Sequence, residues 1–228
     1  EGGTGANLLN TLNVKLTDTV GTTEGLIGVY TAGGGKLTNN AKITGDKGYG
    51  IISNGAEVEN TSDITLTNPL TASKPSVGIL TQAGDKITNT GTVTVGDNSV
   101  GIFGKEIVQK GTITVGNGGT GLYSEGGNVT LDSTSKINTG ANKAVGVFTK
   151  GAGQTITANA GSTMTIGDSS FGFLNEGTGN TINSNVASQA LGNDGTYIYS
   201  SDRTGVVNNN TTLASTGSYN YGLYSAGT

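Results

Sequence analysis

The side chains best suited to catalysis are three carboxylates close together in the chain, Glu57, Glu59 and Asp63. A pair of carboxyl groups can hydrolyse a glycoside, one as the acid and the other as base or nucleophile. Glu57 and Glu59 are two residues apart and would share one face of a strand. No arginine, lysine or aromatic platform recurs beside these carboxylates, so we interpret them as a solvated acidic edge. We therefore expect no catalytic residues and no enzyme.

Other reactive groups are scarce in the 228 residues. There is no Cys and no His, and Arg203 is the one arginine. These counts exclude a cysteine nucleophile, imidazole acid–base chemistry, His-ligated zinc and a bidentate arginine clamp. Asp-containing turns can bind calcium, but residues 118–123 (GGTGLY) lack the aspartate of calcium-loaded β-rolls. We expect no metal and no cofactor, with calcium at a turn left open.

The bulk composition points to a chain built of turns and short strands. Gly (41), Thr (37) and Asn (24) make up nearly half of the residues, and only 12% are charged. The net charge of −4 and the scattered lysines argue against nucleic acid, which needs a concentrated basic face. No apolar run approaches the roughly 20 residues of a membrane span, so we expect a chain that is not itself membrane-spanning.

A four-residue pattern, apolar–Gly–apolar–bulky, recurs along the chain, as in residues 100–103 (VGIF) and 145–148 (VGVF). Its second positions are 20 to 28 residues apart: Gly28, Gly50, Gly78, Gly101, Gly121, Gly146, Gly172, Tyr197 and Gly222. Repeats of this length that vary by a few residues indicate a fixed cross-section with loops of variable length.

Each repeat also contains two further short strands. In residues 87–96 (ITNTGTVTVG), Ile87, Val93 and Val95 alternate with threonines before a Gly-Asp turn. Such alternation is typical of half-buried strands. Three strands in about 24 residues cannot bury a face alone, but stacked coils can. The sequence therefore predicts an all-β fold, a right-handed parallel β-helix of about nine coils with three short strands each.

Asparagines and aspartates follow the same register. Asn39, Asn60 and Asn89 each lie two residues after an apolar strand residue, with Gln109 as their analogue in the next repeat. A buried amide at a turn can bond to its equivalent in the next coil, so we predict a structural asparagine ladder. In the Gly-Asp turns we expect each aspartate to cap its own backbone. These turns are 45–46, 96–97 and 167–168.

The bulky fourth positions allow two interpretations. If Val100 and Ile102 face the core, strand alternation puts Gly101 and Phe103 outside. Successive coils would then stack a stripe that serves as a contact surface. Alternatively, the chain bends at this corner and tucks the rings inward. The aromatic members of the stripe are Tyr30, Phe103, Tyr123, Phe148, Tyr199 and Tyr224.

The domain layout is one continuous array. Residues 1–25 are expected to form an irregular N-terminal coil and residues 26–228 the repeat array, a fragment of a longer rod. The longest repeat contains both prolines of the chain, and proline cannot donate to a strand ladder. We therefore expect a loop that projects from the rod and could bind a ligand through Asn68, Pro69, Lys74 and Pro75.

Two segments carry a family resemblance. Residues 96–103 (GDNSVGIF) and 87–96 (ITNTGTVTVG) resemble units of the passenger domains of type V autotransporter adhesins of Gram-negative bacteria, the fusobacterial ones above all. The resemblance covers roughly residues 26–228. It implies a rod displayed at the cell surface and joined in the full protein to a C-terminal outer-membrane barrel. This chain has neither leader nor barrel, so we expect an excised passenger segment.

The resemblance implies attachment to other bacteria, host cells or matrix, with a surface protein or glycan of another cell as partner. We therefore expect a non-enzymatic adhesin rod at the cell surface or outer membrane. Two alternatives stay open: a purely structural spacer within a long passenger, and a polysaccharide-acting β-helix enzyme. Fold by itself does not decide among the three.

Overall fold

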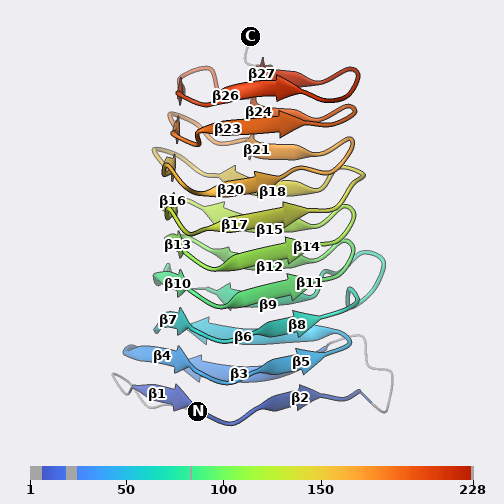
Figure 1. The fold of residues 1–228 in the computed structure, drawn as a ribbon. Helices are drawn as coiled ribbons and strands as arrows, with labels where there is room; N and C mark the ends of the chain where they lie inside the picture. The colour runs from blue at the N-terminus through green and yellow to red at the C-terminus, as the bar shows by residue number, and fades with distance from the viewer. Residues whose placement is uncertain (1–6, 19–24, 83, 227–228) are drawn as a thin grey trace.

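The protein is a rod of stacked β-coils. The computed structural model describes residues 7–18, 25–82 and 84–226, in which there are 27 short strands and no helix. Strands such as β5, β8 and β11 cross the front toward the right, and the chain returns behind them while rising from N to C terminus (Figure 1). This path is right-handed. The predicted all-β, right-handed parallel β-helix is confirmed.

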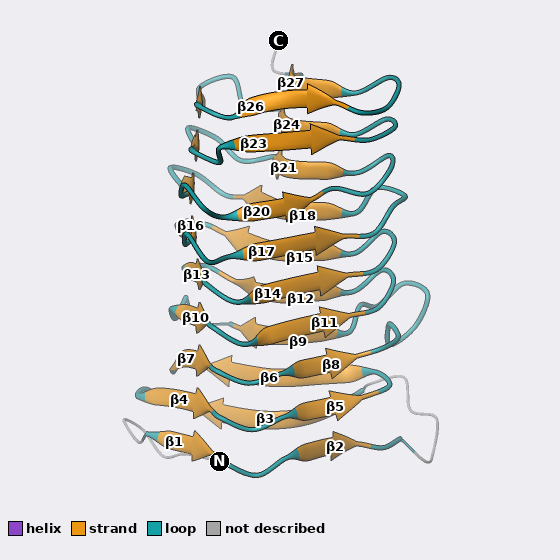
Figure 2. Ribbon diagram, in the orientation of Figure 1, coloured by secondary structure: helices purple, strands orange, loops and turns teal. Residues whose placement is uncertain are grey.

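Three walls run the length of the rod. The A sheet contains β1 (Leu8–Asn10), β4 (Lys36–Asn39), β7 (Glu57–Asn60), β10 (Ile87–Asn89), β13 (Ile107–Gln109), β16 (Val129–Leu131), β19 (Thr155–Ala158), β22 (Thr181–Ser184) and β25 (Val206–Asn209). The B sheet contains β2 (Val14–Leu16), β5 (Ile43–Gly45), β8 (Ile64–Leu66), β11 (Thr92–Val95), β14 (Thr112–Val115), β17 (Lys136–Thr139) and β20 (Thr163–Thr165). The same wall continues as a separate pair, β23 (Ser188–Leu191) and β26 (Thr212–Ser215) (Figure 2).

The C sheet is the third wall and contains the bulky repeat positions. Its nine strands are β3 (Leu26–Ala32), β6 (Gly48–Asn54), β9 (Val77–Thr81), β12 (Val100–Gly104), β15 (Thr120–Glu125), β18 (Val145–Lys150), β21 (Phe171–Asn175), β24 (Thr196–Ser200) and β27 (Tyr221–Ser225). Each strand pairs in parallel with its equivalent one coil away, for example Ile102 with Leu122. Nine strands in this sheet match the predicted nine coils.

The apolar residues of the alternating strands form the core. Ile87, Val93 and Ile102, one from each wall of a coil, are all 0% exposed. In the register, Ile87 lies between Val58 and Ile107, and Val93 between Ile64 and Ile113. Because each coil buries few side chains and each stacks on its equivalents, a chain with little apolar content fills the tube.

The asparagine ladder runs up one inner corner. The Nδ2 atoms of Asn10, Asn39 and Asn60 each donate to the Oδ1 of the next asparagine, at 2.6, 2.7 and 2.7 Å. Asn89 then donates to the Oε1 of Gln109 at 3.0 Å. The next residue in the register is Leu131, and the buried Nε2 of Gln109 has no partner. The ladder thus ends where an apolar residue takes over the column.

Asp97 and Asp168 do not cap their own backbone, as the sequence had predicted, but bind the backbone of the next coil. Asp97 Oδ1 accepts a hydrogen bond from the backbone N–H of Asn117 at 2.8 Å, one coil further on. Asn117 Oδ1 in turn accepts from the N–H of Ala141 at 2.8 Å. Asp168 binds the N–H of Asn193 in the same way, at 3.1 Å. These side chains therefore cap the backbone of the next coil, which ties the corners together along the rod.

The glycine of the repeat faces inward, so the expectation that Gly101 lies outside is wrong. Gly101 is buried, and a Cβ there would lie 2.6 Å from the carbonyl oxygen of Gly121 and 3.0 Å from Cγ2 of Ile113. Ile102 is also buried, so two successive residues face the interior and the alternation breaks at the glycine. The corner leaves no room for a side chain.

Tyr197 is the exception in this glycine column. It is 0% exposed, and its ring packs edge-on against Phe173 with centroids 5.5 Å apart. Its hydroxyl lies 2.6 Å from Ser184 Oγ, and burial raises the pKa of the phenol. The ring thus occupies the interior at the level of β22, where Ser184 is the buried polar partner.

The N-terminal residues join the stack rather than standing apart. β1 pairs with β4 and β2 with β5, so residues 8–16 belong to the first coil. Residues 1–6 and 19–24 of the predicted irregular coil lie outside the described residues. The exposed large apolar side chains gather in the first and last coils: Leu9, Leu12, Ile27 and Tyr30, then Val206, Val207, Tyr219, Tyr221, Leu223 and Tyr224. In the inner coils the large apolar side chains are buried or only partly exposed.

Candidate functional site

The bulky repeat positions form one unbroken column on the outer surface of the C sheet. Register pairs join each member to the next along the rod. We call this column the aromatic stripe: Tyr30, Ile52, Leu80, Phe103, Tyr123, Phe148, Leu174, Tyr199 and Tyr224. Three of its positions are aliphatic, so the six predicted aromatic positions belong to a longer apolar stripe.

The rings of the stripe stack on one another. The centroids of Phe103 and Tyr123 are 4.7 Å apart, as are those of Tyr123 and Phe148. Near the C-terminal end, Tyr199 and Tyr224 stack at 5.3 Å. Aromatic pairs at such separations gain about 0.5–1.5 kcal/mol beyond their burial. The stripe is thus a stabilising column as well as a surface.

The exposure of the rings decides between the two interpretations of the stripe. Phe103, Tyr123 and Phe148 are partly exposed on the outside of the coil. Tyr30 and Tyr224, at the two ends, rise to 40% and 44% because each has a ring or aliphatic neighbour on one side only. The rings are therefore not tucked into the interior, and the stripe is available for contact.

A second column widens this surface. The first residue of each four-residue motif comes directly before the buried glycine and three positions before the stripe residue. In the middle of the rod these residues are Val100, Thr120, Val145 and Phe171, which follow one another in the register. Val145 is buried and the other three are partly exposed. We call the stripe and this column together the aromatic face. Hollows of about 280 Å³ beside Phe103 and about 290 Å³ beside Tyr199 interrupt it.

A row of charges borders the aromatic face, and sequence reasoning missed it. Lys105, Glu125, Lys150 and Glu176 each lie two residues after a stripe residue and are exposed. Glu125 is the register partner of Lys150. The signs alternate from coil to coil. We call these four residues the charged column; its signal was the residue type two positions beyond each bulky residue in four successive repeats.

Tyr123 links the stripe to the charged column. Its hydroxyl donates a hydrogen bond to Oε1 of Glu125 at 3.2 Å. Burial raises the pKa of Tyr123 to about 12, and the nearby charge of Glu125 adds to this. The phenol therefore stays protonated at neutral pH and serves as a hydrogen-bond donor.

Two of the three candidate carboxylates form salt bridges with lysines. Glu59 forms a salt bridge with Lys36 at 2.6 Å, and Asp63 one with Lys42 at 3.3 Å. Both lysines belong to the preceding coil, and Glu57 is exposed beside them. Glu59 and Asp63 are thus each held by a different lysine on the outer surface of the rod. The expectation that no lysine lies beside these carboxylates is therefore wrong, because coils of unequal length bring Lys36 and Lys42 next to them.

The predicted projecting loop connects β8 to β9 and leaves the rod at one corner (Figure 1). Asn68 is held to the coil below, since its Nδ2 donates to Asp46 Oδ1 at 2.5 Å. Thr71 and Lys74 close the tip through two backbone hydrogen bonds of 3.1 and 3.3 Å. Pro69 precedes the buried Leu70, while Pro75 is exposed. The loop is a short ordered excursion with an exposed tip.

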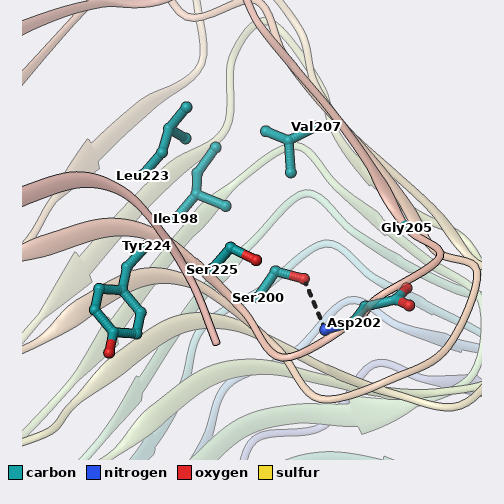
Figure 3. A pocket seen from close by; sticks show the side chains of 8 residues that line it. All are labelled: Ile198, Ser200, Asp202, Gly205, Val207, Leu223, Tyr224 and Ser225. Atoms are coloured by element: carbon teal, nitrogen blue, oxygen red, sulfur yellow. Dashed lines mark hydrogen bonds between the residues drawn. The ribbon is translucent and has the colours of Figure 1, made fainter. Parts of the chain in front are cut away.

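A further hollow, of about 230 Å³, opens at the C-terminal coil between β24, β25 and β27 (Figure 3). Its charged group is Asp202, which accepts hydrogen bonds from the backbone N–H groups of Asn180 at 2.9 Å and Thr204 at 2.8 Å. Burial alone would raise the pKa of this carboxyl, but those donors and that of Gly179 outweigh it and lower the pKa to about 2. Asp202 is therefore a fixed carboxylate that caps a turn.

Among residues 7–18, 25–82 and 84–226, no group of three or more Asp and Glu side chains is placed to hold a metal ion. The described residues also contain no apolar helix of membrane-spanning length.

Comparisons with known proteins add no further assignment. No family model, curated protein or solved structure matches this chain. The surface of the rod is thus the basis on which a function is argued.

Proposed function

We propose that this chain is a non-enzymatic adhesin rod, displayed at a cell surface, that attaches to other bacteria, host cells or matrix through its aromatic face. One observation carries the proposal: the stripe runs in register through all nine strands of the C sheet, and every member except the buried Ile52 is at least partly exposed. Soluble monomers rarely expose a contiguous apolar surface of this kind, and those that do often use it for contact.

The composition of the face suits a protein or glycan partner. Phe and Tyr offer flat apolar contact with little side-chain entropy to lose, and the phenols add hydrogen bonds. Hollows beside Phe103 and Tyr199 could receive side chains or sugar rings. The charged column at the margin would orient a partner. A net charge of −4 without a basic face does not favour nucleic acid.

The rod architecture supports the display of such a face. Each coil adds about 4.8 Å, so nine coils extend roughly 43 Å. A rod carries a contact surface away from the body to which it is attached. The β8–β9 loop, with Lys74 and Pro75 exposed, offers a second and smaller contact site on a different corner.

The test compares two triple variants of the 228-residue chain for binding to bacteria, cultured host cells and extracellular matrix. The first changes Phe103, Tyr123 and Phe148 to Ser and removes the centre of the stripe. The control changes Thr65, Thr94 and Thr114 to Ser on the outer B sheet, where these residues form a register column. We expect the stripe variant to bind at least about tenfold more weakly and the control to bind as the parent does.

Three results would overturn this proposal. If the parent chain binds none of the three targets, its regular stack is better explained as a spacer. If the chain cleaves oligosaccharides in a screen, it is a polysaccharide-acting enzyme, and the unpaired Glu57 would be the first residue to substitute. Equal binding by the stripe variant and the parent would place the contact elsewhere, with the β8–β9 loop next in line.

A further inference from the structure

We propose that the aromatic face docks onto the aromatic face of a second copy of this chain, with the two rods antiparallel. This inference rests on the proposed function, since it names a partner for the same contact surface. It comes from the charged column, in which the signs along the rod are plus at Lys105, minus at Glu125, plus at Lys150 and minus at Glu176.

Such a row is complementary to itself when it is inverted. A two-fold axis in the plane of the interface and perpendicular to the rods reverses the order of coils but keeps the charged columns on the same side. Lys105 then faces the partner's Glu176, and Glu125 faces the partner's Lys150. By symmetry, the pairs formed by Lys150 and Glu176 repeat these two, which makes four complementary pairs in an isologous contact.

Other orientations lack this match. A two-fold axis parallel to the rods places the two charged columns at opposite margins, where they do not meet. An antiparallel contact shifted by one coil sets Lys105 against the partner's Lys150. Like charges across an interface disfavour the wrong register. A shift by two coils restores opposite charges but forms two pairs instead of four, so the alternation favours the antiparallel direction and the register with the axis between β15 and β18.

The spacing of the coils allows all contacts to form together. Both rods have the same strand repeat of about 4.8 Å, so four charged pairs and the apolar residues beside them stay in step. Near the axis, Tyr123 would lie against the partner's Phe148. Nothing in the described chain covers this face, because the other two walls lie across the tube from it (Figure 2).

The charges are also available for a partner. Among the described residues, none of the four side chains of the charged column takes part in a salt bridge within the rod. Glu125 accepts the hydrogen bond of Tyr123, which leaves its second oxygen for a cation. Lys105 borders the hollow beside Phe103, at the edge of the apolar area.

The test uses sign changes measured by sedimentation of the 228-residue chain at low and high salt. Lys105→Glu with Lys150→Glu makes the column wholly acidic, and Glu125→Lys with Glu176→Lys makes it wholly basic. We expect the parent to form dimers that weaken with salt. Each double variant alone should dimerise at least about tenfold more weakly, because every pair becomes repulsive. An equimolar mixture of the two should recover the parental affinity.

A fourfold exchange sharpens the test. A chain with all four substitutions has the reversed alternation, which is again self-complementary. It should dimerise with itself as the parent does and should pair more weakly with the parent, because that mixed contact finds opposite charges only when shifted by one coil and then forms three pairs instead of four. All these residues are exposed, so circular dichroism spectra should match the parent and show that the fold is kept.

The antiparallel orientation can be tested by disulfide cross-linking, because the chain contains no cysteine of its own. Gln82 and Ser201 occupy the same column one coil before Lys105 and one coil after Glu176. In the proposed dimer, Gln82 therefore faces the partner's Ser201. A mixture of Gln82→Cys and Ser201→Cys chains should form a disulfide-linked dimer, and neither chain alone should. A parent that stays monomeric, or that dimerises regardless of the column signs, overturns the inference. In those cases cell binding that still depends on the stripe would leave the adhesin proposal standing.

Discussion

At the scale of single residues, the rod is held by side chains that satisfy one another from coil to coil. Asn60 is fully buried and sits between Asn39 and Asn89, accepting from the first and donating to the second. It also donates to the carbonyl oxygen of Ser62 at 2.8 Å. A buried amide with all its bonds made is stabilising, whereas a broken ladder leaves unpaired groups on both sides.

Removing one asparagine of the ladder should therefore destabilise the fold. We expect Asn60→Ala to lower the free energy of unfolding by about 3 kcal/mol, since Asn39 and Asn89 lose their partners inside the tube. The matched control is Asn40→Ala, one coil below and exposed, whose side chain accepts from Thr61 at 2.7 Å. It should change stability by less than about 0.5 kcal/mol. Urea unfolding measures both, and equal losses would contradict the ladder's role.

The low pKa of Asp202 predicts how the stability of the fold changes as the pH falls. Its pKa of about 2 in the fold lies below the usual value near 3.9 of an unfolded chain. The folded state thus favours the ionised form, and this stabilisation is complete above the unfolded pKa and is lost as the pH falls through the folded one. Between about pH 4 and pH 2, the parent should lose more stability than Asp202→Asn. If the two chains show the same pH dependence of unfolding, the turn does not hold the carboxylate as described.

At the scale of elements, the corner that leads into each C strand depends on the absence of a side chain. Gly28, Gly50, Gly78, Gly101, Gly121 and Gly146 would each place a Cβ within 2.7 Å of a carbonyl oxygen in the next coil. The carbonyl belongs to the equivalent glycine, so the contact repeats along the rod. Backbone atoms on both sides cannot move without disturbing the parallel ladder.

A methyl group at this corner should distort two coils. We expect Gly101→Ala to destabilise the rod by at least about 2 kcal/mol, because the new Cβ would meet the oxygen of Gly121 and the side chain of Ile113. Gly195→Ala is the control, since its nearest atoms would lie 3.7 Å away. That variant should stay within about 0.5 kcal/mol of the parent in thermal unfolding. A harmless Gly101→Ala would mean that the corner can relax.

At the scale of the whole molecule, the rod is a linear stack in which each coil contacts its neighbours. Inner coils are covered on both sides, but Val207 and Leu223 in the last coil are 37% and 53% exposed. Stability in such arrays is a sum of coil and neighbour terms. The ends therefore have fewer stabilising contacts than the middle.

Hydrogen exchange should show this gradient. We expect the backbone amides of β11, β14 and β17 to exchange slowest, and those of β25 to β27 to exchange at least about a hundredfold faster. The reason is that the last coil can open without exposing the inner core. Exchange followed by mass spectrometry measures it peptide by peptide. Uniform protection from β4 to β27 would show that the rod opens as a single unit instead.

Much of this architecture could be predicted from the order of residues. The alternation of Ile87, Val93 and Val95 with threonine, together with a motif returning every 20 to 28 residues, determined the strands, the coil and the asparagine ladder. The reason is local: strand alternation sets which side of the wall a residue occupies, and the repeat length sets which residues stack. These relations need no knowledge of distant contacts.

Other features were decided by the tertiary structure. Gly101 faces inward because the corner approaches the next coil too closely for a side chain, which alternation along one strand does not reveal. Glu59 and Asp63 lie against lysines 21 to 23 residues away in the chain, and loops of unequal length determine that juxtaposition. The outward stacking of Phe103 and the row of alternating charges beside it likewise exist only once the coils are in register, because neighbours along the rod come from different repeats.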